Sequence, residues 1–380
     1  MNSKERVITA INGERPDKVP LGFYLVDFDI IEKVIGRPTY VRNNVRSELG
    51  FAQGLRDEIV ESYKLDTVEF YKKIDIADII TFKEAPLVPP KGWMPIEYSK
   101  IGEETWQDAE GRVYKIAAIS NDVVCIKDPV LDNKQYALSD FLDEVEDVIP
   151  DPTIFEACDY LIKNLGADRY IAGTACRTDS MILLGGMERG LMEFALRPEV
   201  VQAALRYHLI KNNLGDKYYI RPGQDGVLLE EDTGTTRGPL ISPKMYREFC
   251  FPVLKERVSN IKKRGVQVLL HNCGNNRVLM PQFIEAGIQC YESLQTNADM
   301  EIESLKAELG NRLALWGGVP VDLLILGTKD EVRKSVRKAL EIGAPDGGFI
   351  LGPSHSIAYG TKYDNFMAMI DEFDHLRDKY

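Results

Sequence analysis

The feature that most constrains the fold is a repeated alternation of short apolar runs with longer amphipathic segments after about residue 165. Short runs rich in β-branched residues predict strands, and the segments between them carry helical periodicity. One of these helices opens at the cap residue Thr328 and closes at Gly343, a typical start and stop pair. The predicted strands cover residues 169–176, 225–232, 266–273, 288–295, 313–319 and 348–355.

Two earlier apolar runs, at residues 19–26 and 65–72, bring the strand count to eight, the number that a (β/α)₈ TIM barrel requires. An open doubly wound sheet is the alternative, but its glycine-rich fingerprint after an early strand is missing. Residues 87–127 interrupt the rhythm and predict a β-hairpin that turns at 109–111. We therefore predict an α/β fold, a single TIM barrel over residues 1–380 with a hairpin insertion between strands 2 and 3.

The chain carries 59 acidic and 47 basic residues, a formal net charge of −12, which opposes sequence-independent binding to nucleic acid or an anionic membrane. No run approaches the roughly 18 apolar residues of a membrane span, and the amino terminus is charged where a secretory signal is apolar. Six scattered cysteines predict reduced thiols rather than a disulfide framework. We expect a cytoplasmic protein without nucleic-acid or membrane partners.

The strand at 266–273 ends in His271 and Cys273. Strand alternation places both side chains on one face and Asn272 on the other. An imidazole nitrogen and a thiolate sulfur suit Zn²⁺, which in catalytic sites keeps one position open for substrate. The alternative is a buried cysteine beside a histidine that caps the following helix.

A zinc site at this position needs a further protein ligand. His355 ends the strand at 348–355, and the carboxyl ends of all barrel strands face one mouth. We predict His355 as the third ligand, with a catalytic hydrogen bond to substrate as its alternative role. Glu292, at the end of the strand at 288–295, is an alternative ligand.

Three consecutive carboxylates close the strand at 225–232. Alternation puts Glu231 on one face and Glu230 with Asp232 on the other, and one of the two faces must look into the barrel mouth. Glu231 and Asp232 are therefore candidate general acids. For each of them the alternative is a solvated loop charge.

Other polar and aromatic side chains at strand ends are candidates for binding substrate. Arg177 could bind an anion bidentately, or could pair with Asp179 or Glu188 and order its own loop. The aromatic members could stack on a substrate, although large aromatic residues at strand ends are more often packed. The candidate set is Tyr24, Asp27, Arg177, Tyr291, Gln295 and Trp316.

The chain resembles the uroporphyrinogen decarboxylase superfamily in GERPDKVP, EEDTGTTRGPLISPKMYREFCFP, LLHNCGN, LWGGV and GPSHSIAYGTKYDNFMAM, in that order. Within it, the resemblance is to the corrinoid-linked zinc methyltransferases, in their O-demethylase-like branch. It implies a (β/α)₈ barrel with His271 and Cys273 as zinc ligands. Thiol-methylating members carry a second ligand cysteine in the segment where this chain has His355. The decarboxylases carry arginines after the first strand, where this chain reads GFYLVDFDII.

The resemblance implies a zinc-dependent methyltransferase that moves a methyl group from a small methylated substrate, here a methyl ether, to the Co(I) of a corrinoid protein. Zinc would act as a Lewis acid, and Glu231 or Asp232 would protonate the leaving oxygen. The corrinoid, as cob(I)alamin or methylcobalamin, would be supplied by a partner protein. The alternatives are transfer from methylcobalamin to an acceptor thiol, a porphyrinogen-decarboxylase-like decarboxylase, and a non-catalytic ligand-binding barrel.

Overall fold

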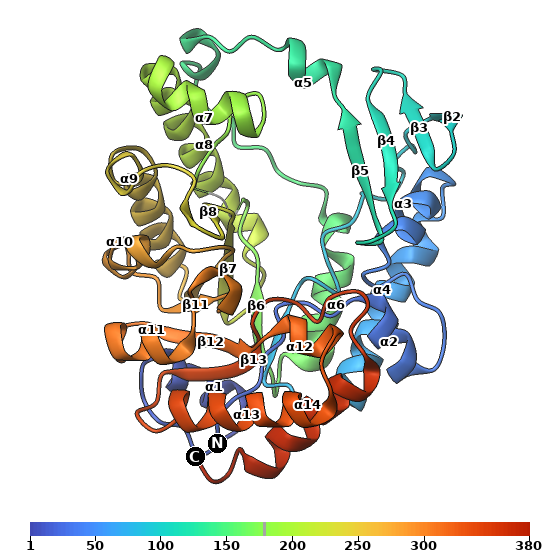
Figure 1. Cartoon of the computed structure of the whole chain (residues 1–380). Coiled ribbons are helices and arrows are strands. Elements are labelled where there is room, and N and C mark those ends of the chain that lie inside the picture. Colours follow the sequence, from blue (N-terminus) through green and yellow to red (C-terminus); the bar gives the residue numbers. More distant parts are fainter. Residues whose placement is uncertain (178–179) are drawn as a thin grey trace.

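The computed structural model describes residues 1–177 and 180–380. Its centre is a parallel sheet of seven strands in the order β1-β6-β7-β10-β11-β12-β13, with helices around it (Figure 1). All six strands predicted after residue 165 are present, with ends that differ from the prediction by at most three residues. The strands are β1 (Ile79–Thr81), β6 (Tyr170–Gly173), β7 (Gly226–Glu231), β10 (Gln267–Asn272), β11 (Cys290–Glu292), β12 (Ala314–Val319) and β13 (Phe349–Pro353).

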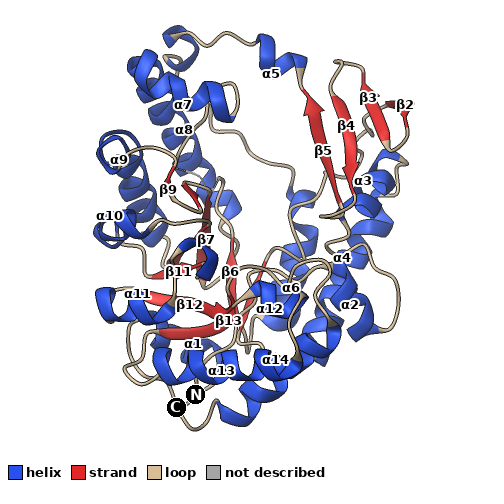
Figure 2. Ribbon diagram, in the orientation of Figure 1, coloured by secondary structure: helices blue, strands red, loops and turns tan. Residues whose placement is uncertain are grey.

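The helices follow the strands along the chain and lie outside the sheet (Figure 2). Thr328 caps α13 through a reciprocal capping box with Glu331, which confirms the start that the sequence predicted. Short 3₁₀ turns cover 138–141, 152–155, 277–279 and 296–298. The helices are α1 (Ser3–Ile11), α2 (Phe28–Ile35), α3 (Asn44–Ala52), α4 (Arg56–Lys73), α5 (Pro129–Asn133), α6 (Glu156–Leu165), α7 (Met187–Leu196), α8 (Pro198–Tyr219), α9 (Pro243–Lys262), α10 (Met280–Ala286), α11 (Ile302–Leu309), α12 (Val321–Ile325), α13 (Lys329–Gly343) and α14 (Tyr363–Leu376).

Residues 19–26 close the sheet between its two edge strands. Leu21 bridges to Leu351 of β13, and Gly22 bridges to Ile79 of β1, both in parallel orientation. The segment therefore occupies the place of the first barrel strand, although it pairs only through isolated bridges. The fold is of the TIM-barrel type, with seven regular strands and one irregular one.

Two buried carboxylates explain why residues 19–26 form no regular strand. The backbone N–H of Leu21 donates to Asp78 (2.9 Å), and that of Val26 donates to Glu84 (2.6 Å). These donors are satisfied by side chains rather than by a neighbouring strand, so the ladder is interrupted. The carboxylates fix the segment in position without regular pairing.

The prediction of a strand at 65–72 is wrong, because these residues belong to α4. The eight-residue window contains the strand-favouring residues Thr67, Val68, Phe70 and Tyr71. The whole helix, however, buries residues 59, 63, 67, 70 and 71 at helical spacing. The second barrel strand is β1, which was not predicted from the sequence.

The predicted hairpin at 87–127 is instead an antiparallel sheet of four strands in sequential order. The expected turn at 109–111 joins the two central strands, but two further turns flank it, with Glu104 and Asn121 at positive φ. This sheet lies between β1 and β6 in the sequence. Its strands are β2 (Tyr98–Gly102), β3 (Thr105–Asp108), β4 (Val113–Ala117) and β5 (Asp122–Lys127).

The apolar core consists of two clusters on opposite faces of the barrel sheet. The larger cluster packs the sheet against the helices. The smaller cluster fills the barrel interior and includes residues of α1, which packs against β1, β6 and β13. Leu228, Leu269, Cys290 and Trp316 belong to this inner cluster, so residues two positions further along their strands also face inward.

All six cysteines are free thiols in the structure, as the sequence predicted. Within the described part of the chain, none of the helices combines the length and apolar character that a membrane crossing requires.

Candidate metal centre

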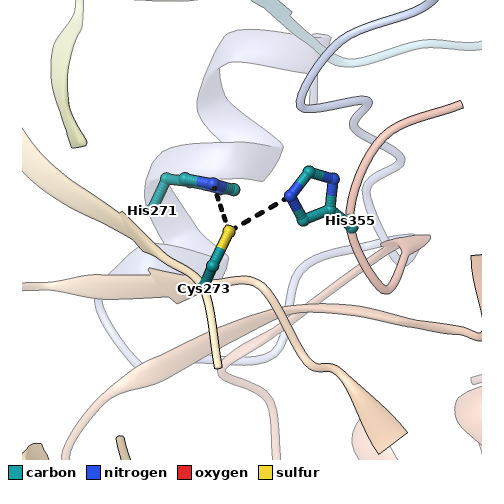
Figure 3. Close-up of side chains that lie close together, drawn as sticks. All are labelled: His271, Cys273 and His355. Carbon is teal, nitrogen blue, oxygen red and sulfur yellow. Dashed lines mark hydrogen bonds between the residues drawn. The ribbon is translucent and has the colours of Figure 1, made fainter. Parts of the chain in front are cut away.

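His271, Cys273 and His355 converge at the carboxyl end of the barrel (Figure 3). His271 lies in β10 two residues after the inward-facing Leu269, Cys273 follows the end of that strand, and His355 follows β13. The Cys273 Sγ atom is 3.2 Å from His271 Nε2 and 3.1 Å from His355 Nε2. Among residues 1–177 and 180–380, these three residues are the one group of three potential ligands close enough to share a metal ion.

Both imidazole rings are oriented through their other nitrogen. His271 Nδ1 contacts the carboxylate of Glu292, and His355 Nδ1 is 2.6 Å from the Ser356 hydroxyl oxygen. Holding Nδ1 in this way leaves Nε2 of each ring directed at the thiol. A carboxylate on the distal nitrogen of a histidine is the usual support for a metal-bound imidazole.

The donor set and its spacing fit zinc. Tetrahedral Zn²⁺ with its ordinary Zn–S and Zn–N bond lengths separates sulfur from nitrogen by about 3.5 Å. The observed S–N distances of 3.1 and 3.2 Å are within a few tenths of an ångström of that value. Imidazole nitrogen and thiolate sulfur are both donors that zinc binds in proteins.

The electrostatic environment also favours a cation. Burial lowers the pKa of both His271 and His355, so the rings are neutral, the form that binds metal. Burial, and then the carboxylates of Asp232 and Glu292, raise the pKa of Cys273. A divalent cation would offset this accumulation of negative charge and stabilise the thiolate.

A network of buried polar side chains supports the loop that carries Cys273. Asn276 donates to the Cys273 carbonyl (2.7 Å) and to Asn272 Oδ1 (3.0 Å), and accepts from the Thr233 hydroxyl (3.0 Å). Tyr291 donates to the carbonyl of Asn272 (2.7 Å). The segment after β7 and the loop after β10 are therefore one hydrogen-bonded unit.

Comparison with known proteins places the chain in a family. The uroporphyrinogen decarboxylase (URO-D) family model matches residues 116–376. The chain belongs to the uroporphyrinogen decarboxylase family. A solved structure of a methyltransferase from Methanosarcina mazei superposes with a TM-score of 0.62 over 99% of each chain, at 18% sequence identity. That likeness supports the TIM-barrel type of fold for this URO-D chain.

Two curated relatives carry methyltransferase names. The chain is 29% identical over 132 residues to the methylated-thiol–coenzyme M methyltransferase of Methanosarcina mazei, covering 34% of this chain and 33% of the relative. It is 23% identical over 173 residues to the methylcobamide:CoM methyltransferase of Methanosarcina acetivorans, covering 46% of this chain and 48% of the relative. The URO-D chain thus spans between a third and a half of these relatives.

The three carboxylates after β7 of this URO-D barrel lie in different places. Asp232 is exposed and close enough to Cys273 and His355 to influence the pKa of both. Glu231 faces away from the mouth: it accepts a hydrogen bond from the Ser180 N–H (2.6 Å) and influences the pKa of Tyr246 in α9. The selection of Glu231 as a candidate acid is therefore wrong, because β7 turns that side chain toward the helices.

Tyr24 is at the mouth of the URO-D barrel, in contact with the cluster. Its ring stacks on the His271 ring with a centroid distance of 3.7 Å and an angle of 4°. Its hydroxyl donates to Glu230 Oε1 (3.2 Å). Tyr24 was predicted to bind substrate, whereas in the structure its ring lies against a candidate metal ligand.

The two aromatic residues predicted to stack on a substrate are fully buried. Trp316 lies in the barrel interior, where its indole N–H donates to the Gly22 carbonyl (3.1 Å). Tyr291 packs on the helix side of the sheet. Neither ring offers a face to solvent, so the stacking interpretation of both residues is wrong and the packing alternative is right.

Asp27 and Gln295, which were also predicted to bind substrate, instead fix the positions of loops. Asp27 forms an ion pair with Arg42 (3.2 Å) and accepts from the Tyr359 N–H (2.9 Å). Gln295 accepts from the Gly274 N–H (2.7 Å), immediately after Cys273.

Arg177 is exposed, and it lines a small cavity between α8 and α9 rather than the metal cluster. Asp179, its predicted partner, lies outside the described residues.

A cavity of about 270 Å³ opens beside the cluster at the ends of β1, β6 and β7. Lys83 and Glu230 line it together and form an ion pair, and the Lys83 ammonium lies 5.1 Å from the centre of the Tyr24 ring. Lys83 was not among the predicted site residues, because β1, the strand that it follows, was not predicted. A prediction of β1 as the second strand would have placed Lys83 at the carboxyl end of the barrel, where site residues are expected.

Proposed function

We propose that this chain is a zinc-dependent, corrinoid-linked methyltransferase. It would move a methyl group from a small methylated substrate, a methyl ether, to the Co(I) of a corrinoid carried by a separate protein. The observation that carries the proposal is the convergence of two imidazole Nε2 atoms on the Cys273 thiol. The methyltransferase names of both curated relatives support it, and the six free cysteines support a cytoplasmic location.

In this proposal His271, Cys273 and His355 hold the zinc ion. Bound zinc would supply a Lewis acid that polarises the oxygen from which the methyl group departs. Glu292 and Tyr24 keep the His271 ring in one orientation through the carboxylate contact and the ring stack.

Asp232 is the candidate general acid. Of the two carboxylates predicted for this role, Glu231 and Asp232, it is the one that lies beside the metal cluster. Its position at the solvent-exposed edge would let it take a proton from water and deliver it to the leaving oxygen.

The cavity at the ends of β1, β6 and β7 is the proposed substrate pocket. Phe82, Leu87 and Leu228 give it apolar walls, and the Lys83–Glu230 pair gives it one polar end. Small-molecule sites combine such apolar surface with a few placed polar groups. The apolar walls would also keep water from the reacting groups.

A second candidate function is transfer in the opposite direction, from methylcobalamin to an acceptor thiol. The names of both curated relatives favour it, since each describes a coenzyme M methyltransferase. His355 favours the ether reaction, because the thiol-methylating members that the chain resembles have a cysteine in that segment. The two functions are separated by supplying defined donors and acceptors.

The test measures zinc content and methyl transfer in the same preparations. Purified protein is analysed for bound zinc and then incubated with methoxylated compounds and a Co(I) corrinoid protein, while methylcobalamin formation is followed by absorbance. His271→Ala and Cys273→Ala should lose zinc and turnover together, whereas the exposed His375→Ala should keep both. A protein that neither contains nor takes up zinc would rule out both methyl transfer functions and leave a decarboxylase or a ligand-binding barrel. Methylation of a thiol by methylcobalamin, without ether turnover, would select the second function.

A further inference from the structure

A cavity of about 660 Å³ lies between α3 and the antiparallel sheet β2–β5. None of its lining residues belongs to the metal cluster or follows a barrel strand. The sheet is held against α3 near its β4–β5 turn, where Asn121 donates to Asn43 (3.2 Å). The volume lies in the range that small-molecule sites occupy.

Three aromatic rings form the sheet side of this cavity. Trp106 of β3 and Tyr114 of β4 are directly opposite each other in the antiparallel register. The ring of Tyr98 in β2 meets that of Tyr114 edge-on, with centroids 5.5 Å apart and an interplanar angle of 85°. All three residues are half-buried and line the cavity, so it has aromatic walls in more than one orientation.

Two carboxylates complete the lining. Glu48 comes from α3 and Glu97 from the residue before β2. Within the described part of the chain, neither carboxylate has a hydrogen-bond or ion-pair partner. Partial burial, and then the nearby Asp122 charge, raise the pKa of Glu48.

The described lining residues include no lysine, arginine or histidine. Lys100 has its side chain on the same sheet face, opposite Trp106 in the register, but it is exposed and does not line the cavity. Arg112, in the turn between β3 and β4, lies beside the Tyr114 hydroxyl and pairs with Asp108 and Glu110. The charge of Arg112 is thus matched by two carboxylates, and no cation is among the described residues that line the cavity.

We propose that this cavity binds a small organic cation that carries an alkylated ammonium group. Aromatic faces attract such a cation through their quadrupole and desolvate its alkyl groups, which an ordinary carboxylate cluster cannot do. The unpaired carboxylates add long-range attraction for positive charge. This binding site is separate from the metal cluster and does not depend on the proposed methyl transfer.

The experiment is a calorimetric titration of the full-length protein with choline and with its uncharged carbon isostere, 3,3-dimethylbutanol. The two probes have the same shape, so their difference measures recognition of charge. Choline should bind roughly tenfold more tightly than the isostere. Trp106→Leu should weaken choline binding by about tenfold, and Glu48→Gln by about threefold.

Glu248→Gln is the matched control, because Glu248 is an exposed carboxylate on α9, away from the cavity. It should leave choline binding unchanged. Because Trp106→Leu could unfold the small sheet, Glu48→Gln is the deciding variant, as it removes the charge and nearly preserves the shape of the side chain. Equal binding of choline and the isostere, unchanged binding by Glu48→Gln, or no binding at millimolar choline would overturn the proposal.

Discussion

The ring of Tyr24 lies flat on the ring of His271, with 3.7 Å between centroids and 4° between planes. Tyr24 comes from the irregular segment that closes the barrel, and His271 comes from β10 on the sheet. The stack therefore connects the barrel closure to the candidate metal ligand. Glu292 contacts the same imidazole at Nδ1, so two elements fix its orientation.

Loss of the Tyr24 ring should weaken zinc binding. In Tyr24→Ala the imidazole keeps its Glu292 contact but gains freedom to rotate, and we expect zinc affinity to fall about tenfold, the usual cost of losing support around a metal ligand. Tyr24→Phe retains the ring stack, and its zinc affinity should be within about threefold of that of the unsubstituted protein. Competition with a chromophoric chelator measures both values. Equal affinities of Tyr24→Ala and the original protein would show that Glu292 alone is sufficient.

Asn276 should be important for stability as well as for the position of Cys273. Its side chain is fully buried and bonds to Cys273, Asn272 and Thr233. Asn276→Ala removes these three buried hydrogen bonds, and we expect the free energy of unfolding to fall by about 2 to 4 kcal/mol. Asn133→Ala, on the exposed helix α5, should change it by less than about 0.5 kcal/mol. Urea unfolding compares the two, and similar values would contradict the assigned role.

The buried pair of Asp216 in α8 and Arg257 in α9 should show a strong asymmetry between single and double substitution. Both side chains are almost inaccessible, with Nη1–Oδ2 and Nη2–Oδ1 distances of 2.6 and 3.0 Å. Arg257→Met leaves the buried Asp216 carboxylate without its ion-pair partner. We expect it to lower the free energy of unfolding by about 3 to 5 kcal/mol. The double variant Asp216→Leu with Arg257→Met should recover part of that loss in urea unfolding. A double variant less stable than the single one would contradict this expectation.

Glu84 should make stability depend on pH. It is fully buried, accepts hydrogen bonds from the Val26 N–H and the Tyr71 hydroxyl, and burial raises its pKa from 4.5 to about 7. The folded state therefore binds a proton more tightly than the unfolded state. The stabilisation from proton binding by Glu84 is complete below the pKa that this group has in the unfolded chain. It is lost as the pH rises from about 4.5 to about 7.

The matched variant Glu84→Gln should remove this part of the pH dependence. Between pH 5 and pH 8, the free energy of unfolding of the original protein should fall by about 2 to 3 kcal/mol relative to that of the variant. Urea unfolding at both pH values measures the difference. Parallel pH profiles for the two proteins would show that Glu84 is ionised in the fold at both values.

Much of the fold was predictable because the signals were local. The six strands after residue 165 and the helix after Thr328 depend on short apolar runs, caps and turn residues, all visible in a window of about a dozen residues. His271 and Cys273 were visible for the same reason, since a strand alternates its faces by a fixed rule.

Two predictions were wrong for different reasons. For one, too short a stretch of sequence was considered, and for the other, the sequence did not determine which face of a strand points into the barrel. Residues 65–72 are rich in β-branched and aromatic residues, as strands are, yet the helix that contains them is evident only when its whole length is considered. Glu231 and Asp232 are adjacent in sequence, and alternation requires them to face opposite ways. The sequence could not say which of them faces the mouth, because that depends on how β7 sits in the closed barrel.

The sequence by itself therefore determined the strand and helix rhythm, the barrel class and the histidine–cysteine pair, since each follows from local spacing. Only the tertiary structure decided that His355, 82 residues after Cys273, brings its Nε2 within 3.1 Å of the thiol, and that Tyr24 and Glu292 orient His271. Contacts between distant segments depend on barrel closure and strand register. Both are set by the packing of the whole chain rather than by any one segment.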